Sequence, residues 1–316
     1  MVANPRCVIL DDYQGVATTY ADWSALPVDV EVVREHLDPD ATAAALAGAE
    51  VAVLMRERTP LGRELLDRLP DLRLVVTTGM RNAAIDLEAC RERGIPVCGT
   101  ESSKSPPAEL TWALVLGLLR HVVPESRALA AGVWQTTVGG DLAGRTLALL
   151  GLGAIGSRVA RVGAAFEMDV VAWSPHLTDA RAAEAGVRRV GRDELFARAD
   201  VLSLHLVLGE TTRGIVGERE LGLLRPSAYL VNTSRAGLVD SAALLRALDE
   251  GRLAGAGLDV FETEPLPPGD PLRDHPRVLA TPHLGYVTEA NYRRFFTAAV
   301  EDVAAWLAGS PVRELR

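Results

Sequence analysis

The chain has few cysteines: Cys7, Cys90 and Cys98 are the only three in 316 residues, and no two of them have CxxC spacing. This scarcity argues against a disulfide framework and a zinc site, so we expect three small buried side chains and no metal. Long apolar runs are also missing, since the longest, residues 112–119, is far short of the ~20 residues that cross a bilayer. The first residues lack the apolar segment of a signal peptide. These absences predict a cytoplasmic protein without a membrane partner.

Basic residues are fewer than acidic residues. Lys and Arg number 33 against 42 Asp and Glu, which gives a net charge of −9 at pH 7, and no cluster of basic residues stands out. This balance argues against nucleic acid as a partner. The rest of the composition is that of an ordinary globular protein, and the length predicts two domains.

Short runs rich in β-branched residues recur through the first hundred residues and alternate with helical or turn-like segments. The predicted strands are residues 7–10, 28–33, 51–55, 74–76 and 95–98, and the predicted helices are residues 40–48 and 60–69. Such alternation is typical of α/β units on a parallel sheet.

The pattern changes after a polar, proline-containing break at residues 101–107. A helix over 108–121 that is apolar on nearly every face is expected to be buried. From a buried strand at 146–150, strand and helix patterns alternate again to about residue 279, which predicts a second α/β domain. A helical stripe over 289–307 could pack on either domain.

Three glycines directly after the strand at 146–150 form a G-x-G-x-x-G sequence, and a helical pattern and a second strand at 169–173 follow it. In this context Gly151 allows a tight turn, Gly153 lets the backbone approach a pyrophosphate, and Gly156 lets the helix pack on the strand. The N-terminus of that helix would face the phosphates. The arrangement predicts a dinucleotide-binding site.

The residue that ends the second strand usually decides between NAD and NADP, because an acid there accepts hydrogen bonds from the ribose 2′-hydroxyl and repels a 2′-phosphate. Here it is Ser174, which removes the repulsion, and His176 and Arg181 could face a phosphate. Alternatively Asp179 or water serves the ribose. The expected cofactor is NAD or NADP, with NAD slightly favoured.

Three polar features follow later apolar strand signals. Arg235 follows one strand, Asp259 and Glu264 follow the next, and His283 follows a third. Taken singly, Arg235 could be a surface cation, Glu264 a turn cap and His283 a core histidine. Because strand ends in a doubly wound sheet converge on the ligand crevice, we expect these side chains to meet there.

These motifs resemble the D-isomer-specific 2-hydroxyacid dehydrogenase family, which includes phosphoglycerate dehydrogenase, glyoxylate/hydroxypyruvate reductase and D-lactate dehydrogenase. The resemblance covers nearly the whole chain and is most specific over residues 142–286. It implies two doubly wound parallel-sheet domains: a Rossmann NAD(P)-binding domain, residues 102–287, inserted into a flavodoxin-like substrate domain, residues 1–101 plus 288–316. It also implies a homodimer through the cofactor domain.

The resemblance gives the polar residues their roles. His283 takes the place of the acid/base, which needs a pKa near neutral; Glu264 would orient it, and Arg235 would bind the substrate carboxylate. Asp259 would hold the nicotinamide carboxamide. Besides the three glycines and Asp259, the expected cofactor-binding residues are Ala154, Ile155, Ser174, His205, Leu206, Thr233, Ser234 and Gly285. The expected substrate-binding residues are Arg56, Gly79, Met80, Arg81 and Arg235.

Three departures from the family pattern concern cofactor and substrate. Ser174 replaces the usual Asp, and the sequence that begins at His205 differs from the usual His-x-Pro-Leu-Thr. Arg81 stands at the second glycine of a Gly-x-Gly loop whose amides bind the substrate carboxylate in the family. We expect Arg81 to point into the cleft between the domains and to bind a second anionic group; the alternative is an ion pair with Asp86 or Glu88.

The sequence therefore predicts an NAD(P)-dependent oxidoreductase that acts on a small anionic D-2-hydroxy or 2-keto acid. Glu264 argues against a formate dehydrogenase, which usually has Gln there. Two alternatives remain: a dinucleotide-sensing, corepressor-like regulator, and a dehydrogenase of a phosphorus acid such as phosphite.

Overall fold

Two parallel sheets, each with its own helices, make up the structure, a computed structural model that describes residues 4–315. Unit 1 consists of Met1–Ser103 and Val287–Arg316, and unit 2 of Lys104–Tyr286. The predicted fold class, two parallel-sheet α/β domains, is confirmed. No helix in the described part of the chain combines the length and hydrophobicity needed to cross a lipid bilayer.

The sheet of unit 1 has the strand order β2-β1-β3-β4-β5. Its strands are β1 (Arg6–Ile9), β2 (Asp29–Val32), β3 (Val51–Leu54), β4 (Leu74–Thr77) and β5 (Val97–Gly99). They lie close to the five predicted segments. The central strands β3 and β4 are buried along their whole length because helices cover both faces, which explains their unbroken apolar sequence.

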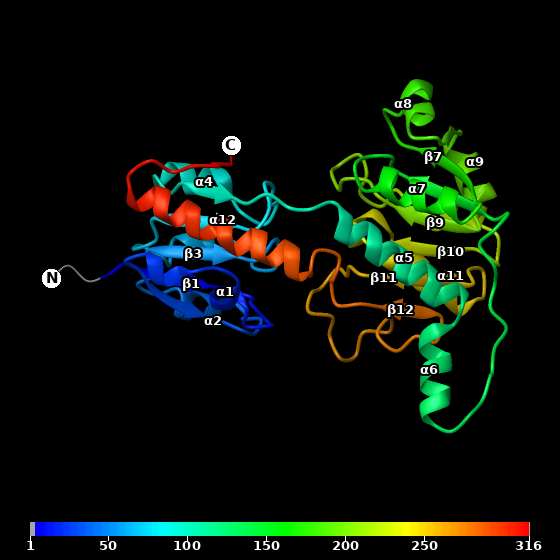
Figure 1. Cartoon of the computed structure of the whole chain (residues 1–316), viewed down its shortest axis with the longest axis horizontal. Coiled ribbons are helices and arrows are strands. Elements are labelled where there is room, and N and C mark those ends of the chain that lie inside the picture. The colour runs from blue at the N-terminus through cyan, green and yellow to red at the C-terminus, as the bar shows by residue number, and fades with distance from the viewer. Residues whose placement is uncertain (1–3, 316) are drawn as a thin grey trace. The chain divides into compact units, whose positions relative to one another are not determined.

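The helices of unit 1 are α1 (Ala17–Tyr20), α2 (Pro39–Ala45), α3 (Arg63–Leu66), α4 (Leu87–Glu92) and α12 (Glu289–Leu307), with a 3₁₀ turn at Trp23–Ala25. The helical stripe predicted over 289–307 is confirmed, and α12 lies against β4 and β5 with Phe295, Phe296 and Val303 fully buried (Figure 1). The helix predicted over 60–69 is wrong in its extent: α3 begins only after Gly62, the N-cap, whose backbone is extended.

The sheet of unit 2 has the strand order β12-β11-β10-β9-β6-β7-β8, in parallel throughout. Its strands are β6 (Thr146–Leu150), β7 (Asp169–Trp173), β8 (Arg188–Arg189), β9 (Val201–Leu204), β10 (Tyr229–Asn232), β11 (Gly255–Leu258) and β12 (Val278–Ala280). The direction of the strand order reverses at β6 and β9, where a doubly wound sheet opens its ligand crevice.

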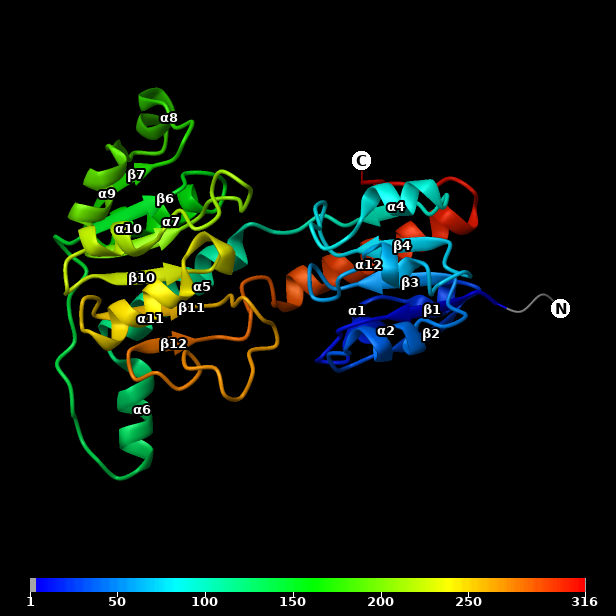
Figure 2. The same ribbon diagram turned by 180° about the vertical axis from the view of Figure 1, so that it is seen from behind.

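Helices cover both faces of this second sheet. The helices of unit 2 are α5 (Ser105–Leu119), α6 (Val122–Ala130), α7 (Gly156–Ala165), α8 (Asp179–Glu184), α9 (Arg192–Arg198), α10 (Glu218–Leu223) and α11 (Ser241–Asp249), with a 3₁₀ turn at Ala236–Leu238. Helices α5 and α7 lie over one face (Figure 1), and α10 and α11 lie over the other (Figure 2). The prediction of a buried helix after the proline-containing break is confirmed by the buried Trp112, Leu114, Val115 and Leu119 of α5.

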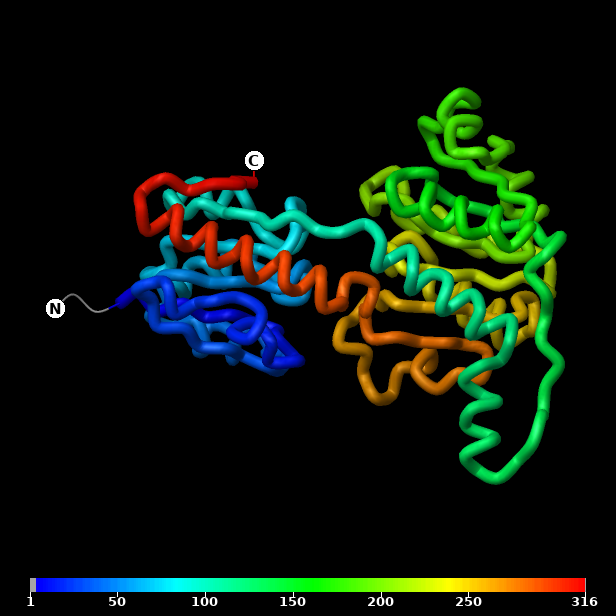
Figure 3. Tube along the Cα trace, in the orientation of Figure 1, coloured from blue at the N-terminus to red at the C-terminus, as the bar shows by residue number. Residues whose placement is uncertain are grey.

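Helix α6 is an element that the sequence did not predict. It begins after His121, which adopts the left-handed conformation, and none of its residues is buried. Helix α6 and the segment that returns from it to β6 project away from the sheet of unit 2 (Figure 3). The three cysteines are free and buried, as predicted.

Candidate active site

The glycine-rich turn between β6 and α7 leaves no room for side chains at two of its three glycines. Gly151 has φ +110°, and a Cβ there would lie 2.7 Å from the His205 carbonyl oxygen; a Cβ on Gly156 would lie 2.3 Å from the Gly151 carbonyl oxygen. Gly153 faces open space, and both it and Ala154 are exposed just before α7. The turn therefore offers backbone N–H groups and a helix N-terminus, the features that bind a pyrophosphate.

Ser174 lies directly after β7, beside this turn, because the Gly151 N–H donates to the Trp173 carbonyl oxygen at 2.8 Å. It is half-buried, whereas His176 and Arg181 are exposed. Asp179, the alternative partner of the ribose, lies 3.3 Å from the Arg189 guanidinium. No carboxylate ends β7, so this position lacks the charge that repels a 2′-phosphate.

Side chains that follow β9 and β10 tie these two strand ends together. Ser234 Oγ donates to the Leu206 carbonyl oxygen at 2.7 Å, and Thr233 Oγ1 lies 2.8 Å from Thr111 Oγ1 on α5. His205 Nε2 is 2.9 Å from Ser203 Oγ, and burial lowers the pKa of His205 to about 4. His205 is therefore neutral at physiological pH, and it closes the wall behind Gly151.

His283 and Glu264, which we expected to meet at the strand ends and which the family resemblance pairs, are in direct contact in unit 2. His283 Nδ1 lies 2.6 Å from Glu264 Oε2, and the two side chains are only 17% and 27% exposed. The second oxygen, Glu264 Oε1, accepts from the Phe261 N–H at 2.9 Å. Tyr286 stands edge-on to the imidazole, with the ring centroids 5.3 Å apart. The imidazole thus has one nitrogen fixed by a carboxylate.

The charge state of Glu264 results from opposing effects. Burial raises the pKa of Glu264, but the hydrogen bond and charge of His283, the Phe261 N–H and the charge of Arg235 together hold that pKa below its usual value. Glu264 is therefore ionised at neutral pH.

Arg235 lies on a turn after β10 that Asn232 shapes. The Asn232 amide donates to the Arg235 carbonyl oxygen at 3.0 Å, and its oxygen accepts from the Ser234 N–H at 3.0 Å. The Arg235 guanidinium donates to the Ser234 carbonyl oxygen at 2.8 Å. Asn232 was not identified from the sequence, although a buried Asn at the end of an apolar strand is the available signal.

Asp259 is fully buried and organises the turn that carries His283. Its Oδ1 accepts from Thr281 Oγ1 at 2.6 Å and from the Leu284 N–H at 2.7 Å, and its Oδ2 accepts from the Gly285 N–H at 2.8 Å. Burial raises the pKa of Asp259, and these donors act against that rise. The predicted contact of Asp259 with a nicotinamide carboxamide remains a prediction.

The predicted substrate-binding residues of unit 1 lie together at the carboxyl ends of β3 and β4. Gly79 has φ +105°, and a Cβ there would lie 1.8 Å from a guanidinium nitrogen of Arg56, which donates to the Thr78 carbonyl oxygen at 3.1 Å. The Gly79 N–H donates to Thr100 Oγ1 at 3.0 Å. The amides of Met80 and Arg81 have no acceptor among the described residues.

The Arg81 side chain is exposed, and the described residues contain no ion pair between it and Asp86 or Glu88. Asp86 accepts from the Ala89 N–H at 2.8 Å and so caps α4. The surface pairing offered as an alternative for Arg81 is therefore absent from the structure.

Comparison with known proteins gives concordant matches. Residues 112–285 match the family described as "D-isomer specific 2-hydroxyacid dehydrogenase, NAD binding domain". The chain is 38% identical to glyoxylate reductase of Aeropyrum pernix over 256 residues, which cover 78% of this chain and 76% of that protein. It is 35% identical to D-3-phosphoglycerate dehydrogenase of Bacillus subtilis over 83% of this chain, and it spans about half the length of that enzyme.

A solved structure shows the same fold. The phosphoglycerate oxidoreductase of Vibrio cholerae superposes with a TM-score of 0.91 at 39% identity, over 97% of this chain and 100% of that one.

Replacement of Asp259 should destabilise the turn that carries His283. Asn cannot accept hydrogen bonds at both side-chain positions, so Asp259→Asn leaves a buried N–H without an acceptor, at a cost of about 1–3 kcal/mol. We expect that loss in the free energy of urea unfolding, together with a lower kcat. Thr281→Val, which removes one hydroxyl and leaves both peptide donors satisfied, should cost less. Equal stability of Asp259→Asn and the wild type would contradict this role.

Proposed function

The chain belongs to the D-isomer-specific 2-hydroxyacid dehydrogenase family, and we propose that it transfers a hydride between NAD(P) and C2 of a small D-2-hydroxy or 2-keto acid. One observation carries the proposal: the 2.6 Å contact between His283 Nδ1 and Glu264 Oε2. A histidine held by a carboxylate is the proton donor and acceptor that interconversion of a hydroxyl and a carbonyl requires.

The dinucleotide belongs to unit 2, and the substrate-binding loop to unit 1. The turn at Gly151, Gly153 and Gly156 fits a pyrophosphate, because its only unobstructed glycine, Gly153, is exposed at the start of α7. A dinucleotide whose pyrophosphate is held there would supply or accept the hydride through its nicotinamide ring. In this assignment, residues 102–287 form the cofactor-binding domain, and residues 1–101 plus 288–316 form the substrate-binding domain.

His283 acts as the acid in reduction and as the base in oxidation. Because Nδ1 is engaged by Glu264, Nε2 is the nitrogen that exchanges a proton with the C2 oxygen. Glu264 holds the ring in one orientation and stabilises its charged form. Arg235, with its fixed positive charge, binds the carboxylate and polarises the C2 oxygen.

The loop at Gly79 supplies further anion contacts. The N–H groups of Met80 and Arg81 are available to a carboxylate, whereas the N–H of Gly79 is engaged by Thr100. The exposed Arg81 guanidinium adds a second cation that binds two oxygens at once. This favours a substrate with a second anionic group, a dicarboxylate or a phosphorylated acid.

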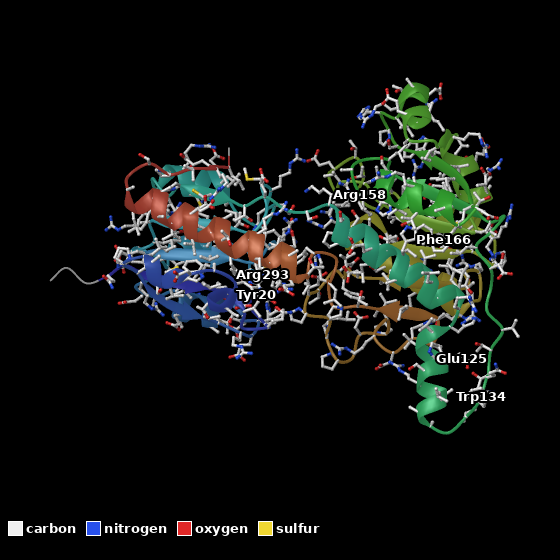
Figure 4. The ribbon with its side chains drawn as sticks, in the orientation of Figure 1. Tyr20, Glu125, Trp134, Arg158, Phe166 and Arg293 are labelled. Atoms are coloured by element: carbon white, nitrogen blue, oxygen red, sulfur yellow. The ribbon has the colours of Figure 1, made fainter. Side chains whose placement is uncertain are left out.

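The protein is a homodimer that associates through α6 and the segment that follows it. Leu129, Trp134 and Val138 are 58%, 75% and 94% exposed. Glu125 and Trp134 lie on this projecting part of unit 2 (Figure 4). Glu125 Oε1 accepts from Thr136 Oγ1 and Thr137 Oγ1 at 2.7 Å, which fixes the segment against the helix. A second copy of the chain would cover these apolar side chains.

The proton-transfer role of Glu264 predicts a change in the pH dependence of reduction. Reduction needs the protonated imidazole and declines as pH rises. Glu264→Gln removes the carboxylate that favours the charged ring, so the decline in kcat/KM should begin at a lower pH. The assay follows reduced nicotinamide absorbance with a panel of 2-keto acids and with NADH or NADPH.

The matched control for that experiment is Glu262→Gln, an exposed carboxylate on the same loop that accepts from Ser241. Its pH profile should equal that of the wild type. An unchanged profile in Glu264→Gln would remove Glu264 from this role, and a wild type that reduces no 2-keto acid would favour the regulator or the phosphorus acid dehydrogenase.

The Arg81 proposal predicts a KM effect that depends on the substrate. Arg81→Ala should raise KM for 2-keto acids with a second anionic group at least tenfold, which corresponds to about 1.4 kcal/mol, and should leave KM for pyruvate within about twofold. Arg91→Ala, which removes another exposed arginine of unit 1, is the control. If Arg81→Ala leaves KM for every accepted acid within about twofold, Arg81 is not an anchor.

The proposed interface predicts that charged substitutions in it will dissociate the dimer. Leu129→Asp combined with Trp134→Asp places charges in the apolar contact and should give monomers in sedimentation equilibrium, whereas Leu307→Asp, at another exposed apolar position, should not. Monomeric wild type, or a double variant that is still dimeric, would place the interface elsewhere.

A further inference from the structure

Residues 313–315 extend the sheet of unit 1 beyond its edge strand β5. The Gly99 N–H donates to the Arg313 carbonyl oxygen at 3.0 Å, and the Leu315 N–H donates to the Val97 carbonyl oxygen at 2.8 Å. Cys98 and Glu314 form an antiparallel bridge. After α12 the chain turns back on itself to reach this position (Figure 3). The segment thus covers an edge that would otherwise expose unpaired backbone groups.

Arg313 anchors this segment to α12. Its Nε donates to Asp302 Oδ1 at 2.9 Å, and its two terminal nitrogens donate to Glu301 Oε2 at 2.9 Å and to the Ala298 carbonyl oxygen at 2.8 Å. Arg313 itself adopts a left-handed backbone with φ +54°. Because Asp302 is fully buried, this charged contact fixes where along the helix the segment can sit.

The anchored segment meets the candidate substrate loop at Gly99. A Cβ on Gly99 would lie 2.6 Å from Leu315 Cδ1, 2.7 Å from the Gly79 carbonyl oxygen and 3.2 Å from Met80 Sδ. These three atoms therefore converge on the space that a side chain at position 99 would occupy. The next residue, Thr100, is buried and accepts the Gly79 N–H.

We propose that Leu315 and Gly99 are positioning residues for substrate binding: together they set the position of the Gly79–Arg81 loop, and so aim the amides of Met80 and Arg81 at the substrate carboxylate. The proposal rests on the proposed function of that loop. Leu315 Cδ1 borders the same space beside Gly99 as the Gly79 carbonyl oxygen and Met80 Sδ, Thr100 holds the Gly79 N–H, and Arg56 holds the Thr78 carbonyl oxygen.

The expected consequence is on KM rather than kcat. Hydrogen bonds from amides to a carboxylate depend steeply on alignment, so a loop displaced by a fraction of an ångström binds the acid less well. The proton-transfer pair belongs to other residues and is untouched. A purely structural role at the sheet edge would instead lower stability and leave KM for the acid unchanged.

The test compares Leu315→Ala, Leu315→Met and Gly99→Ala with Val312→Ala, a matched control at an exposed apolar residue of the same segment. We expect Leu315→Ala to raise KM for the accepted 2-keto acid about three- to tenfold, with kcat and KM for the reduced cofactor within about twofold. Leu315→Met, which refills most of the volume, should restore KM.

The Gly99→Ala variant shows which of two neighbours, Leu315 or the Gly79 backbone, moves when a methyl group is added at position 99. A methyl group there collides with a side-chain carbon of Leu315, which can move, and with the Gly79 carbonyl oxygen, which belongs to the backbone. If the loop is what yields, KM rises for Gly99→Ala and stays raised when Leu315→Ala is added. If Gly99→Ala leaves KM unchanged, only Leu315 yields, and Gly99 does not set the position of the loop.

Amide hydrogen exchange of the peptide that covers residues 78–82 gives a readout that does not depend on catalysis. Leu315→Ala should speed its exchange, while Val312→Ala should not. A wild type that reduces no 2-keto acid would defeat the proposed function and leave this measurement valid. Unchanged exchange, or an unchanged KM in an active Leu315→Ala, would overturn the positioning role.

Discussion

The hydrogen bond between Glu264 and His283 is the contact on which the proposed chemistry of unit 2 depends, and the parallel arrangement of the sheet makes this contact possible. The two residues follow β11 and β12, which pair in parallel from Ala256 opposite Val278 to Leu258 opposite Ala280. Parallel neighbours end at the same edge, so a carboxylate after one strand and an imidazole after the next can meet at 2.6 Å. An antiparallel pair would send the two residues to opposite edges.

A second, buried carboxylate, that of Asp259, holds the turn that carries His283. Asp259 is buried, and no cationic side chain in the described part of the chain is bonded to it, so its burial would be costly if its oxygens lacked donors. Thr281, Leu284 and Gly285 supply three donors, and they all belong to the turn that carries His283. The cost of burying Asp259 is therefore offset only while that turn keeps its shape, which couples the folding of the turn to the orientation of the imidazole.

Elements with a strong local pattern could be predicted from the sequence, and the family resemblance, together with the expected convergence of strand ends, implied the pairing of Glu264 with His283. Helix α12 matches its predicted stripe because Phe295, Phe296 and Val303 face a core. Helix α6 was not predicted, because it has only 9 residues, contains Pro124 near its start and buries none of its residues in this chain. The contacts of Asp259 could not be predicted either, because two of its three donors are backbone amides. Every residue except proline has such a donor, so the sequence does not mark them.

Left-handed backbone conformations mark the carboxyl ends of the strands in both units. Arg56 follows β3 with φ +54°, Gly79 follows β4 with φ +105°, and His283 follows β12 with φ +53°. For a residue with a side chain this conformation costs on the order of 1 kcal/mol or more, and it persists only where neighbouring bonds enforce it. The Arg56 N–H donates to Thr78 Oγ1 at 2.9 Å, and the His283 N–H donates to the Thr281 carbonyl oxygen at 2.9 Å. Local bonds therefore aim both side chains: the imidazole of His283 takes the proton-transfer role in the proposed reaction, and the Arg56 guanidinium donates to the Thr78 carbonyl oxygen beside the proposed substrate loop.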